Sequence, residues 1–241
     1  MLVSQNADLL DITIPRLLGQ VDWCLIVMDN ESKEVEEKIY EYQKKYYNRM
    51  FVRRSSIPSN LVYRQGVRNY HWRWKSCKGV IRDDVFINLR KILDQGKAGY
   101  DKIDILLWPD SDVIFTDYLP ELLDNFMASD CKAIAMKHVD VVGDMVTIKQ
   151  SNIGHHVHIM KYSRELAGLP WRFYAMYYPL TRADLMRVDY YSVHLAYFNS
   201  GIRNWRNENW KSNEIRDGDL RKLDKSVEKL SPEEITNFLK V

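Results

Sequence analysis

Three continuous apolar runs, separated by amphipathic segments, constrain the fold more than any other feature of this sequence. The runs cover residues 23–28, 103–108 and 133–136 and are apolar at all but one position. Between them, residues 33–48 and about 118–128 carry apolar side chains at helical spacing. Runs that are apolar on both faces are typical of strands in parallel sheets covered by helices. The pattern predicts an α/β fold in which helices flank a mostly parallel, Rossmann-type sheet.

The composition is that of an ordinary globular protein. The 241 residues are 46% hydrophobic and 28% charged, which excludes the disordered and fibrous classes. The three cysteines are widely spaced and form no C-x-x-C pair, so we expect neither a disulfide framework nor a zinc knuckle. The N-terminus lacks a basic segment followed by an apolar stretch, and no window approaches the roughly 18 apolar residues of a membrane span. We therefore expect a cytoplasmic protein without a membrane span.

Polar residues follow two of the apolar runs at their carboxyl ends, where ligands bind in open parallel sheets. The first run is followed by Asp29, Asn30 and Ser32, and the second by Asp110 and Asp112. Two carboxylates at this spacing can hold a divalent metal that bridges phosphate oxygens. A turn capped by aspartate side chains is the alternative interpretation. The strand ends therefore predict either a site for a nucleotide diphosphate and a metal or a capped turn.

These strand ends belong to a longer ordered pattern. It comprises residues 6–10, residues 21–32 and the sequence Leu-Leu-Trp-Pro-Asp-Ser-Asp over 106–112. The order resembles the nucleotide-sugar-binding half of family-2 glycosyltransferases of the GT-A fold, in which one strand ends in Asp-Asn-Gly-Ser and another in Asp-x-Asp. Residues 192–197, with the Arg and Trp residues after them, resemble the family's C-terminal His-x-x-Tyr segment. The resemblance covers most of residues 3–210.

The resemblance implies a single GT-A-like domain over residues 1–241. Residues 1–137 would form the nucleotide-sugar-binding half, with a basic insertion over residues 49–100. Residues 138–241 would form an irregular half that contacts the acceptor, closes the metal site and ends in a helix. A Ser-Pro-Glu-Glu sequence near the C-terminus has the pattern of a capping box and predicts where this last helix begins.

The resemblance also implies roles for individual residues of the donor site. Asp29 would accept hydrogen bonds from the base or ribose of the nucleotide, while Asn30 and Ser32 would shape the turn. Asp110 would face the ribose and belong to the metal shell. The turn reads Asn-Glu-Ser instead of Asn-Gly-Ser, so Glu31 replaces a residue with wider backbone freedom.

A metal site is implied at Asp110, Asp112 and His194. Asp112 would ligate Mn²⁺ or Mg²⁺ across the diphosphate, and His194 would be a further contact to the metal or to phosphate. A neutral imidazole is a credible ligand, but a histidine between Val193 and Leu195 is also typical of a packed strand residue. Both interpretations of His194 are therefore kept.

The catalytic base is the least defined part of the predicted site. An inverting transferase needs a carboxylate that takes the proton of the acceptor hydroxyl. Asp140 and Asp144 follow the run over residues 133–136 and are the candidates, with surface turns as the alternative interpretation. If neither is the base, a retaining mechanism is favoured instead. Val113 also departs from the family, in which an acidic residue often follows the Asp-x-Asp motif.

Basic residues are concentrated in one window. Residues 49–82 contain nine Lys or Arg and no acidic residue, so the other 26 basic residues face all 33 acidic ones and leave a charge of −7 elsewhere. A basic window with interleaved aromatic residues can bind a phosphate-bearing acceptor such as a nucleic acid or a lipid diphosphate. A solvated loop that serves the donor diphosphate is the alternative, and Arg68 is the expected phosphate contact.

Three histidines close in sequence have three interpretations. His155, His156 and His158 could form a metal site, contact the acceptor or its phosphate, or line the polar face of a strand. The alternation of His156 and His158 with Val157 and Ile159 favours the strand. The absence of an adjacent cysteine or carboxylate in the sequence argues against a dedicated metal site.

The expected function is metal-dependent transfer of a hexosyl or pentosyl group from a nucleotide diphosphate sugar, UDP-linked, to a hydroxyl acceptor. Mn²⁺ or Mg²⁺ is the expected cofactor. One alternative within the same chemistry is a DNA-modifying sugar transferase that acts on a hydroxylated, flipped base. An alternative of another class is a non-catalytic module that binds nucleotides or nucleic acid.

Overall fold

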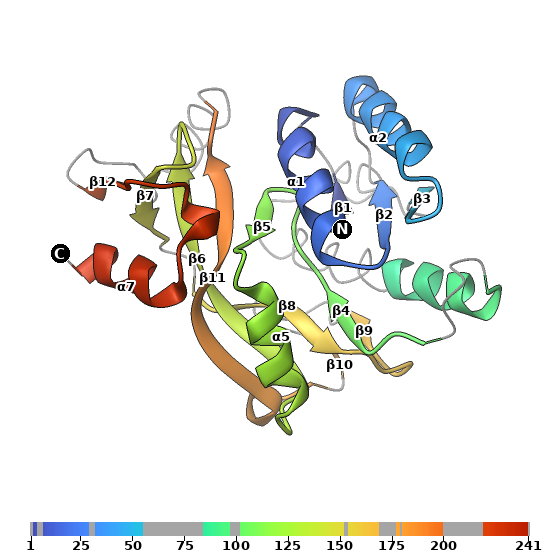
Figure 1. The fold of residues 1–241 in the computed structure, drawn as a ribbon. Helices are drawn as coiled ribbons and strands as arrows, with labels where there is room; N and C mark the ends of the chain where they lie inside the picture. The colour runs from blue at the N-terminus through green and yellow to red at the C-terminus, as the bar shows by residue number, and fades with distance from the viewer. Residues whose placement is uncertain are drawn as a thin grey trace, which may run out of the picture.

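The chain folds as a mixed α/β protein, with two main sheets and helices packed against them (Figure 1). The computed structural model describes residues 2–3, 7–28, 32–54, 84–96, 102–151, 154–168, 177–178, 180–199 and 219–240. The predicted α/β class is therefore confirmed. Within these ranges, no helix is both long and apolar enough to cross a membrane.

The first sheet is parallel throughout. Its strands are β1 (Leu2–Val3), β2 (Cys24–Met28) and β3 (Met50–Arg54), with β2 between the other two. Helices α1 (Ala7–Gln20) and α2 (Lys33–Lys45) connect these strands, because parallel neighbours need a crossover of a dozen or more residues. The predicted first strand and the helix after it are both present.

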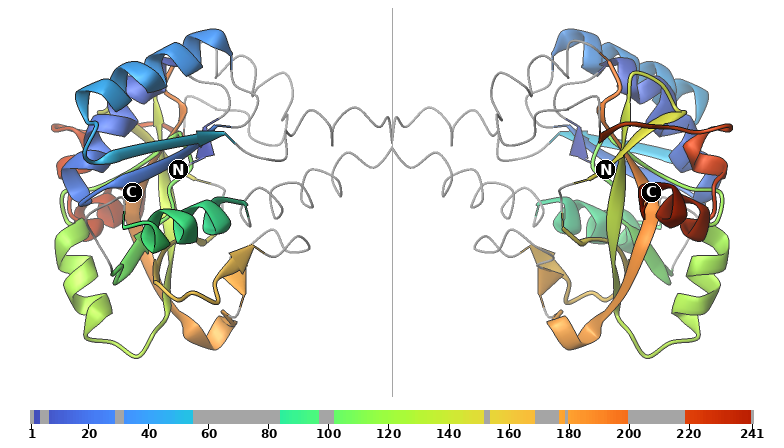
Figure 2. Two further views of the ribbon diagram at one scale, coloured as in Figure 1. Left: turned by 90° about the vertical axis from the view of Figure 1, so that its right-hand side faces the viewer. Right: turned by 90° about the vertical axis from the view of Figure 1, so that its left-hand side faces the viewer.

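Helices cover both faces of β2, which explains why all five of its residues are buried. Ile26 and Met28 pack in the core under α1 and α2. Leu25 and Val27 point to the opposite face and pack with a helix over residues 84–94. Figure 2 shows the strands of this sheet between α1 and α2 on one side and that helix on the other. The continuous apolar run is thus a strand with two buried faces.

The second sheet has seven strands and is mostly antiparallel. It contains β4 (Ile105–Leu107), β5 (Val113–Phe115), β6 (Ala133–Val142), β7 (Thr147–Gln150), β8 (His156–Lys161), β11 (Leu185–Tyr197) and β12 (Arg221–Lys222). Its main path is β12-β7-β6-β11-β5, and β8 pairs with both β6 and β4. Only β6 and β11 are parallel to each other within this sheet. Among the described strands, the predicted mostly parallel arrangement is therefore limited to β1–β3 and this one pair.

Short connections explain why the second sheet departs from the prediction. The link from β6 to β7 spans residues 143–146, and strands joined by so short a link can pair only antiparallel. Gly143 begins this turn with a φ of 78°, in the left-handed region. Asp144 Oδ1 accepts hydrogen bonds from the backbone N–H groups of Val146 at 2.9 Å and Thr147 at 2.6 Å. Asp144 is therefore a turn residue.

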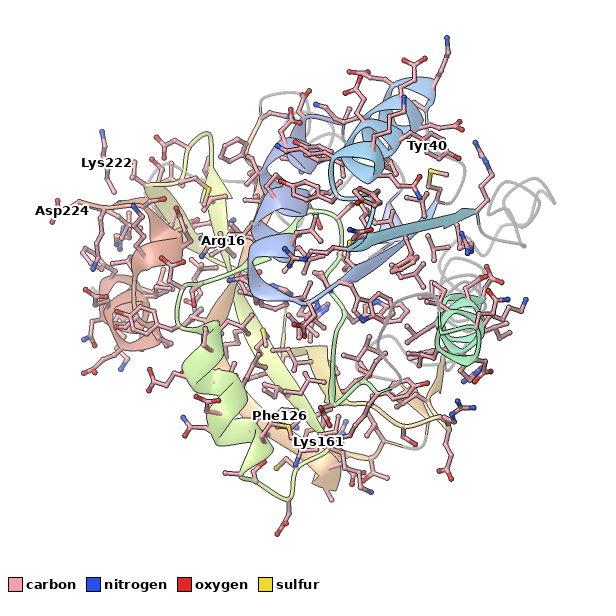
Figure 3. All side chains as sticks on the ribbon, turned by 45° about the vertical axis from the view of Figure 1, so that its right-hand side comes forward. Arg16, Tyr40, Phe126, Lys161, Lys222 and Asp224 are labelled. Carbon is pink, nitrogen blue, oxygen red and sulfur yellow. The ribbon has the colours of Figure 1, made fainter. Side chains whose placement is uncertain are left out.

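Helices α5 (Leu119–Met127) and α7 (Pro232–Lys240) pack on the second sheet. The side chains of Phe126 on α5 and Lys161 on β8 lie together (Figure 3). Lys161 Nζ lies 5.2 Å from the centroid of the Phe126 ring. At the start of α7, Glu234 accepts from Ser231 N at 2.7 Å, and Ser231 Oγ accepts from Glu234 N at 3.2 Å. This reciprocal pair confirms the predicted capping box.

The remaining short elements are β9 (Ala167–Gly168), β10 (Tyr177–Tyr178), η1 (Arg182–Asp184) and η4 (Val227–Lys229). Contacts of α1 join the two sheets. Arg16, labelled in Figure 3, donates two hydrogen bonds to Phe115 O at 3.2 and 3.1 Å and pairs with Asp117. The first sheet and its helices are thus fixed against β5.

Candidate metal centre

The Asp-x-Asp segment and the C-terminal histidine meet because β11 lies between β5 and β6. Asp112 directly precedes β5, and its carbonyl oxygen accepts a hydrogen bond from Leu195 N at 2.7 Å. His194 pairs in register with Val113 of β5 on one side and with Asp140 of β6 on the other. Strand register therefore places His194 between Asp112 and Asp140.

Each ring nitrogen of His194 faces a carboxylate. Nδ1 lies 2.8 Å from Asp140 Oδ1, and Nε2 lies 3.3 Å from Asp112 Oδ2. The exposed fractions of the side chains are 5% for Asp140, 8% for His194 and 17% for Asp112. Metal-binding histidines commonly donate one ring N–H to a carboxylate and offer the other nitrogen to the metal. Asp140 and His194 have this relationship.

The two carboxylates also control the charge of the imidazole. Burial lowers the pKa of His194, but Asp112 and Asp140 outweigh this effect and raise the pKa to about 9, above the ordinary 6.5. Without a metal, His194 is therefore an imidazolium at neutral pH. A metal bound at Nε2 has to displace the proton on that nitrogen, so binding is coupled to proton release.

Asp112 and His194 fit a divalent cation. Ligands at about 2.0–2.2 Å from an ion and at right angles lie about 3 Å apart, close to the 3.3 Å between Asp112 Oδ2 and His194 Nε2. Asp110 belongs to the same turn, and its carbonyl oxygen accepts from Val113 N at 3.2 Å. The structure thus brings Asp112 and His194 together, as the resemblance implies, and adds Asp140 as their partner.

Two of the predicted donor-binding residues, Ser32 and Asp110, lie in the described part of the chain. Ser32 caps α2, where its Oγ accepts from Val35 N at 3.3 Å. Asp29, Asn30 and Arg68 lie outside the described residues. Of the donor-site predictions, the structure therefore shows Ser32 at a helix start and Asp110 in the turn that carries Asp112.

Two residues of the basic window are engaged in structural contacts. Arg49 donates to the carbonyl oxygen of Asp22 at 2.8 Å. Arg54 forms an ion pair with Glu36 of α2. Residues 55–82, which contain most of the window, lie outside the described part of the chain. These two contacts stabilise the first sheet, and acceptor binding by the window stays a prediction.

A cluster of three histidines, His138 of β6 with His156 and His158 of β8, lies beside the metal centre. One ligand atom from each lies within 4.8 Å of the others. The ring centroid of His138 is 5.4 Å from that of His194. Burial lowers the pKa of His138 well below its ordinary value, and the neighbouring histidines lower it further. His138 is therefore neutral at neutral pH.

The cluster differs by one member from the predicted histidine set. His155 is not part of it, and its Nε2 lies 3.6 Å from an Asp189 carboxylate oxygen. His138 takes its place and is a residue that the sequence patterns above do not single out. The sequence pattern that could have indicated His138 lies in β6. There, His138 and Asp140 alternate with buried valines that pack in the core near α7. Alternate residues of a strand point to opposite faces, so the two polar side chains leave that core together.

Comparison with models of known protein families gives no match, and comparison with curated proteins gives none either. The functional interpretation therefore depends on the residues of this chain and on their geometry.

A cavity of about 300 Å³ lies between α1, β2, β4 and the helix over residues 84–94. Trp23, Leu89 and Trp108 contribute to its lining. Asp112, Asp140 and His194 are not among the lining residues. The candidate metal centre therefore lies outside this cavity.

Proposed function

We propose that the protein is a metal-dependent glycosyltransferase that moves a sugar from a nucleotide diphosphate donor, UDP-linked, to a hydroxyl acceptor. The separation of 3.3 Å between Asp112 Oδ2 and His194 Nε2 carries this proposal, because it suits two ligands of one cation. Asp112 ends the Asp-x-Asp motif, and His194 begins the His-x-x-Tyr motif, of the family that the sequence resembles. The geometry thus agrees with the roles that the resemblance implies.

A GT-A-like arrangement is part of the proposal. The parallel β1–β2–β3 unit with α1 and α2 is of the kind that binds nucleotides beyond the carboxyl ends of its strands. Leu9 of α1 packs in one core cluster with Ile114 of β5 and Val193 of β11. This contact supports a donor site shared by the first sheet and the turn that carries Asp112.

The side chains of the proposed metal centre would have different roles. Asp112 and His194 would hold Mn²⁺ or Mg²⁺, which when bound neutralises charge on the departing diphosphate. Asp140 would accept the Nδ1 proton of His194, so that the proton displaced by a metal would be the one on Nε2, which faces Asp112. Asp140 is thus a positioning residue in this proposal and not the base that the sequence suggests.

Asp144 is a poor candidate for the base as well. Burial raises the pKa of Asp144, but hydrogen bonds from Val146 and Thr147 outweigh it and lower the pKa. A carboxylate with a lowered pKa is a weaker proton acceptor at neutral pH. We therefore assign Asp144 to the β6–β7 turn.

A screen of nucleotide sugars for metal-dependent hydrolysis tests the activity. We expect at least one UDP-sugar to be hydrolysed faster with Mn²⁺ than with chelator. Asp112→Asn should lower the rate by about 100-fold or more, since loss of even an outer-shell partner costs about 10–100-fold. Asp124→Asn, an exposed change on α5, is the matched control and should leave the rate unchanged. Metal-dependent binding without hydrolysis of any nucleotide sugar would instead favour a non-catalytic nucleotide-binding module.

A further inference from the structure

The hydrogen bonds of His138 and His158 determine which ring nitrogen carries the proton. His158 Nδ1 lies 2.9 Å from Trp108 O, and a carbonyl oxygen can only accept, so this nitrogen donates. Ser192 Oγ donates to Lys137 O at 3.1 Å. The same oxygen lies 3.1 Å from His138 Nδ1 and, having used its proton, accepts from it. We assign a proton to Nδ1 of both rings.

This assignment leaves two lone pairs facing each other. In a neutral imidazole with the proton on Nδ1, Nε2 is an acceptor. The Nε2 atoms of His138 and His158 lie 3.2 Å apart, and each residue is 3% exposed. Two acceptors at this distance repel each other in a buried site. A cation between the two nitrogens, either a shared proton or a metal ion, converts the repulsion into attraction.

The distances favour a metal ion. With metal–nitrogen bonds of about 2.0–2.1 Å, two nitrogens 3.2 Å apart subtend an angle of about 100° at the metal, near the tetrahedral value. A proton is shared by two rings, whereas a metal takes three or four ligands. The third histidine, His156, is half-buried and has its ligand atom within 4.8 Å of the other two, so it can serve as the third ligand after a small movement of its ring.

The fold holds these rings in place by a strand irregularity. Ile134 pairs with Ile159 and Ala135 pairs with Val157, so β8 bulges at His158. Bulges redirect side chains and are common near functional sites. Trp108, just before the turn that carries Asp112, donates its N–H to His158 O and accepts from the His158 ring. The rings of His156 and His158 stack with their planes 16° apart.

We propose that His138, His156 and His158 bind one transition-metal ion of the zinc class, at a site separate from Asp112 and His194. Three imidazoles suit Zn²⁺, Cu²⁺ or Ni²⁺, whereas Mg²⁺ and Mn²⁺ prefer oxygen ligands. Three protein ligands leave a fourth position for water, as in zinc sites with an open position. The proposal of this second site does not depend on the proposed glycosyltransferase activity.

Binding of Co²⁺, which replaces Zn²⁺ and absorbs visible light, tests the site in the 241-residue protein after removal of metals. We expect one tetrahedral Co²⁺ spectrum that Zn²⁺ abolishes by displacement. His156→Asn and His158→Asn should each weaken binding at least tenfold, since even outer-shell changes cost about 10–100-fold. His155→Asn is the matched control, because His155 lies outside the cluster, and should bind as the unchanged protein does.

Three results would contradict the proposed histidine metal site. They are absence of a tetrahedral spectrum, equal losses in His155→Asn and His156→Asn, and loss of the spectrum in Asp112→Asn with retention in His156→Asn. The last result would place the ion at Asp112 and His194. Metal-dependent UDP binding by His156→Asn checks the other centre separately, so failure at one site is distinguishable from failure at the other.

A measurement on the unchanged protein avoids variants that fail to fold. Nitrogen NMR of the imidazoles, with and without Zn²⁺, reports the state of both Nε2 atoms. We expect Zn²⁺ to shift the Nε2 signals of His138 and His158 while both Nδ1 atoms keep their protons. A proton on one of these Nε2 atoms that persists unchanged at saturating Zn²⁺ would mean that the rings share a proton, and would refute the metal site.

Discussion

Nδ1 of His194 lies 2.8 Å from Oδ1 of Asp140, at a position where β11 and β6 pair in parallel. Both side chains are buried, so the hydrogen bond sets the orientation of the ring. That orientation leaves Nε2 facing Asp112. In the proposed metal centre, Asp140 would therefore act on the cation through His194 and not by direct contact.

Changing Asp140 should weaken the metal centre in a graded way. Asp140→Asn keeps an acceptor oxygen but removes the charge, and we expect Mn²⁺ to bind about tenfold more weakly in the presence of UDP; Asp140→Ala should cost about 100-fold. Because the charge of Asp140 helps to hold the proton on His194, Asp140→Asn should also shift the pH profile of Mn²⁺ binding to lower pH. Titrations of Mn²⁺ across pH measure both effects. Equal affinities and profiles in all three proteins would show that Asp140 does not position the ring.

The stability of the metal-free protein should fall as the pH rises through 9, because His194 loses its proton there. The pKa of His194 in the folded protein is about 9, above the ordinary 6.5. Its stabilising contribution is thus fully present below about pH 6.5, is lost between there and about pH 9, and is on the order of 3 kcal/mol. Urea unfolding with chelator at pH 6.5, 8 and 9.5 measures the loss.

A His194→Gln variant isolates this contribution from other titrating groups. Asp112 and Asp140 face His194 directly, and His138 lies beside it with a lowered pKa. We expect the difference in unfolding free energy between the two proteins to shrink as the pH rises. A difference that stays constant from pH 6.5 to 9.5 would mean that His194 is not held as an imidazolium.

Gly143 and Gly19 should respond in opposite ways to alanine. A Cβ meets nothing within 4 Å at either position, but Gly143 has a φ of 78° and Gly19 does not have a positive φ. Gly143→Ala should therefore destabilise the β6–β7 turn by about 1 kcal/mol. Gly19→Ala, inside α1, should stabilise by about 0.5 kcal/mol. Urea unfolding of both variants measures this, and destabilisation of similar size in both would contradict the backbone explanation.

The parts of the fold that the sequence predicts correctly are those in which local pattern and burial agree. The apolar run that forms β2 is buried on both faces, and Ser231 with Glu234 forms a capping box at α7. The second sheet was harder to predict, because its antiparallel order depends on short links such as residues 143–146 and on which strand returns beside which. An apolar run indicates that both faces of a strand are buried, which is common in parallel sheets, but burial alone does not determine the direction of the neighbouring strands.

The residues of the candidate site likewise fall into two groups, those that local motifs indicate and those that depend on strand pairing. Asp112 and His194 could be chosen from motifs, but Asp140 and His138 depend on the register of β6 against β11. In the sequence, Asp140 is one carboxylate among several, and its role appears only when His194 is placed beside it. His138 becomes noticeable when the bulge at His158 directs a second ring toward it.

Calorimetric titration with UDP, with and without Mn²⁺, tests the central claim most directly. If Asp112 and His194 hold the cation that bridges the donor diphosphate, UDP should bind only with Mn²⁺, and Asp112→Asn should abolish binding while Asp124→Asn leaves it intact. UDP binding that is equal with and without Mn²⁺, or that survives in Asp112→Asn, would contradict the proposed metal centre.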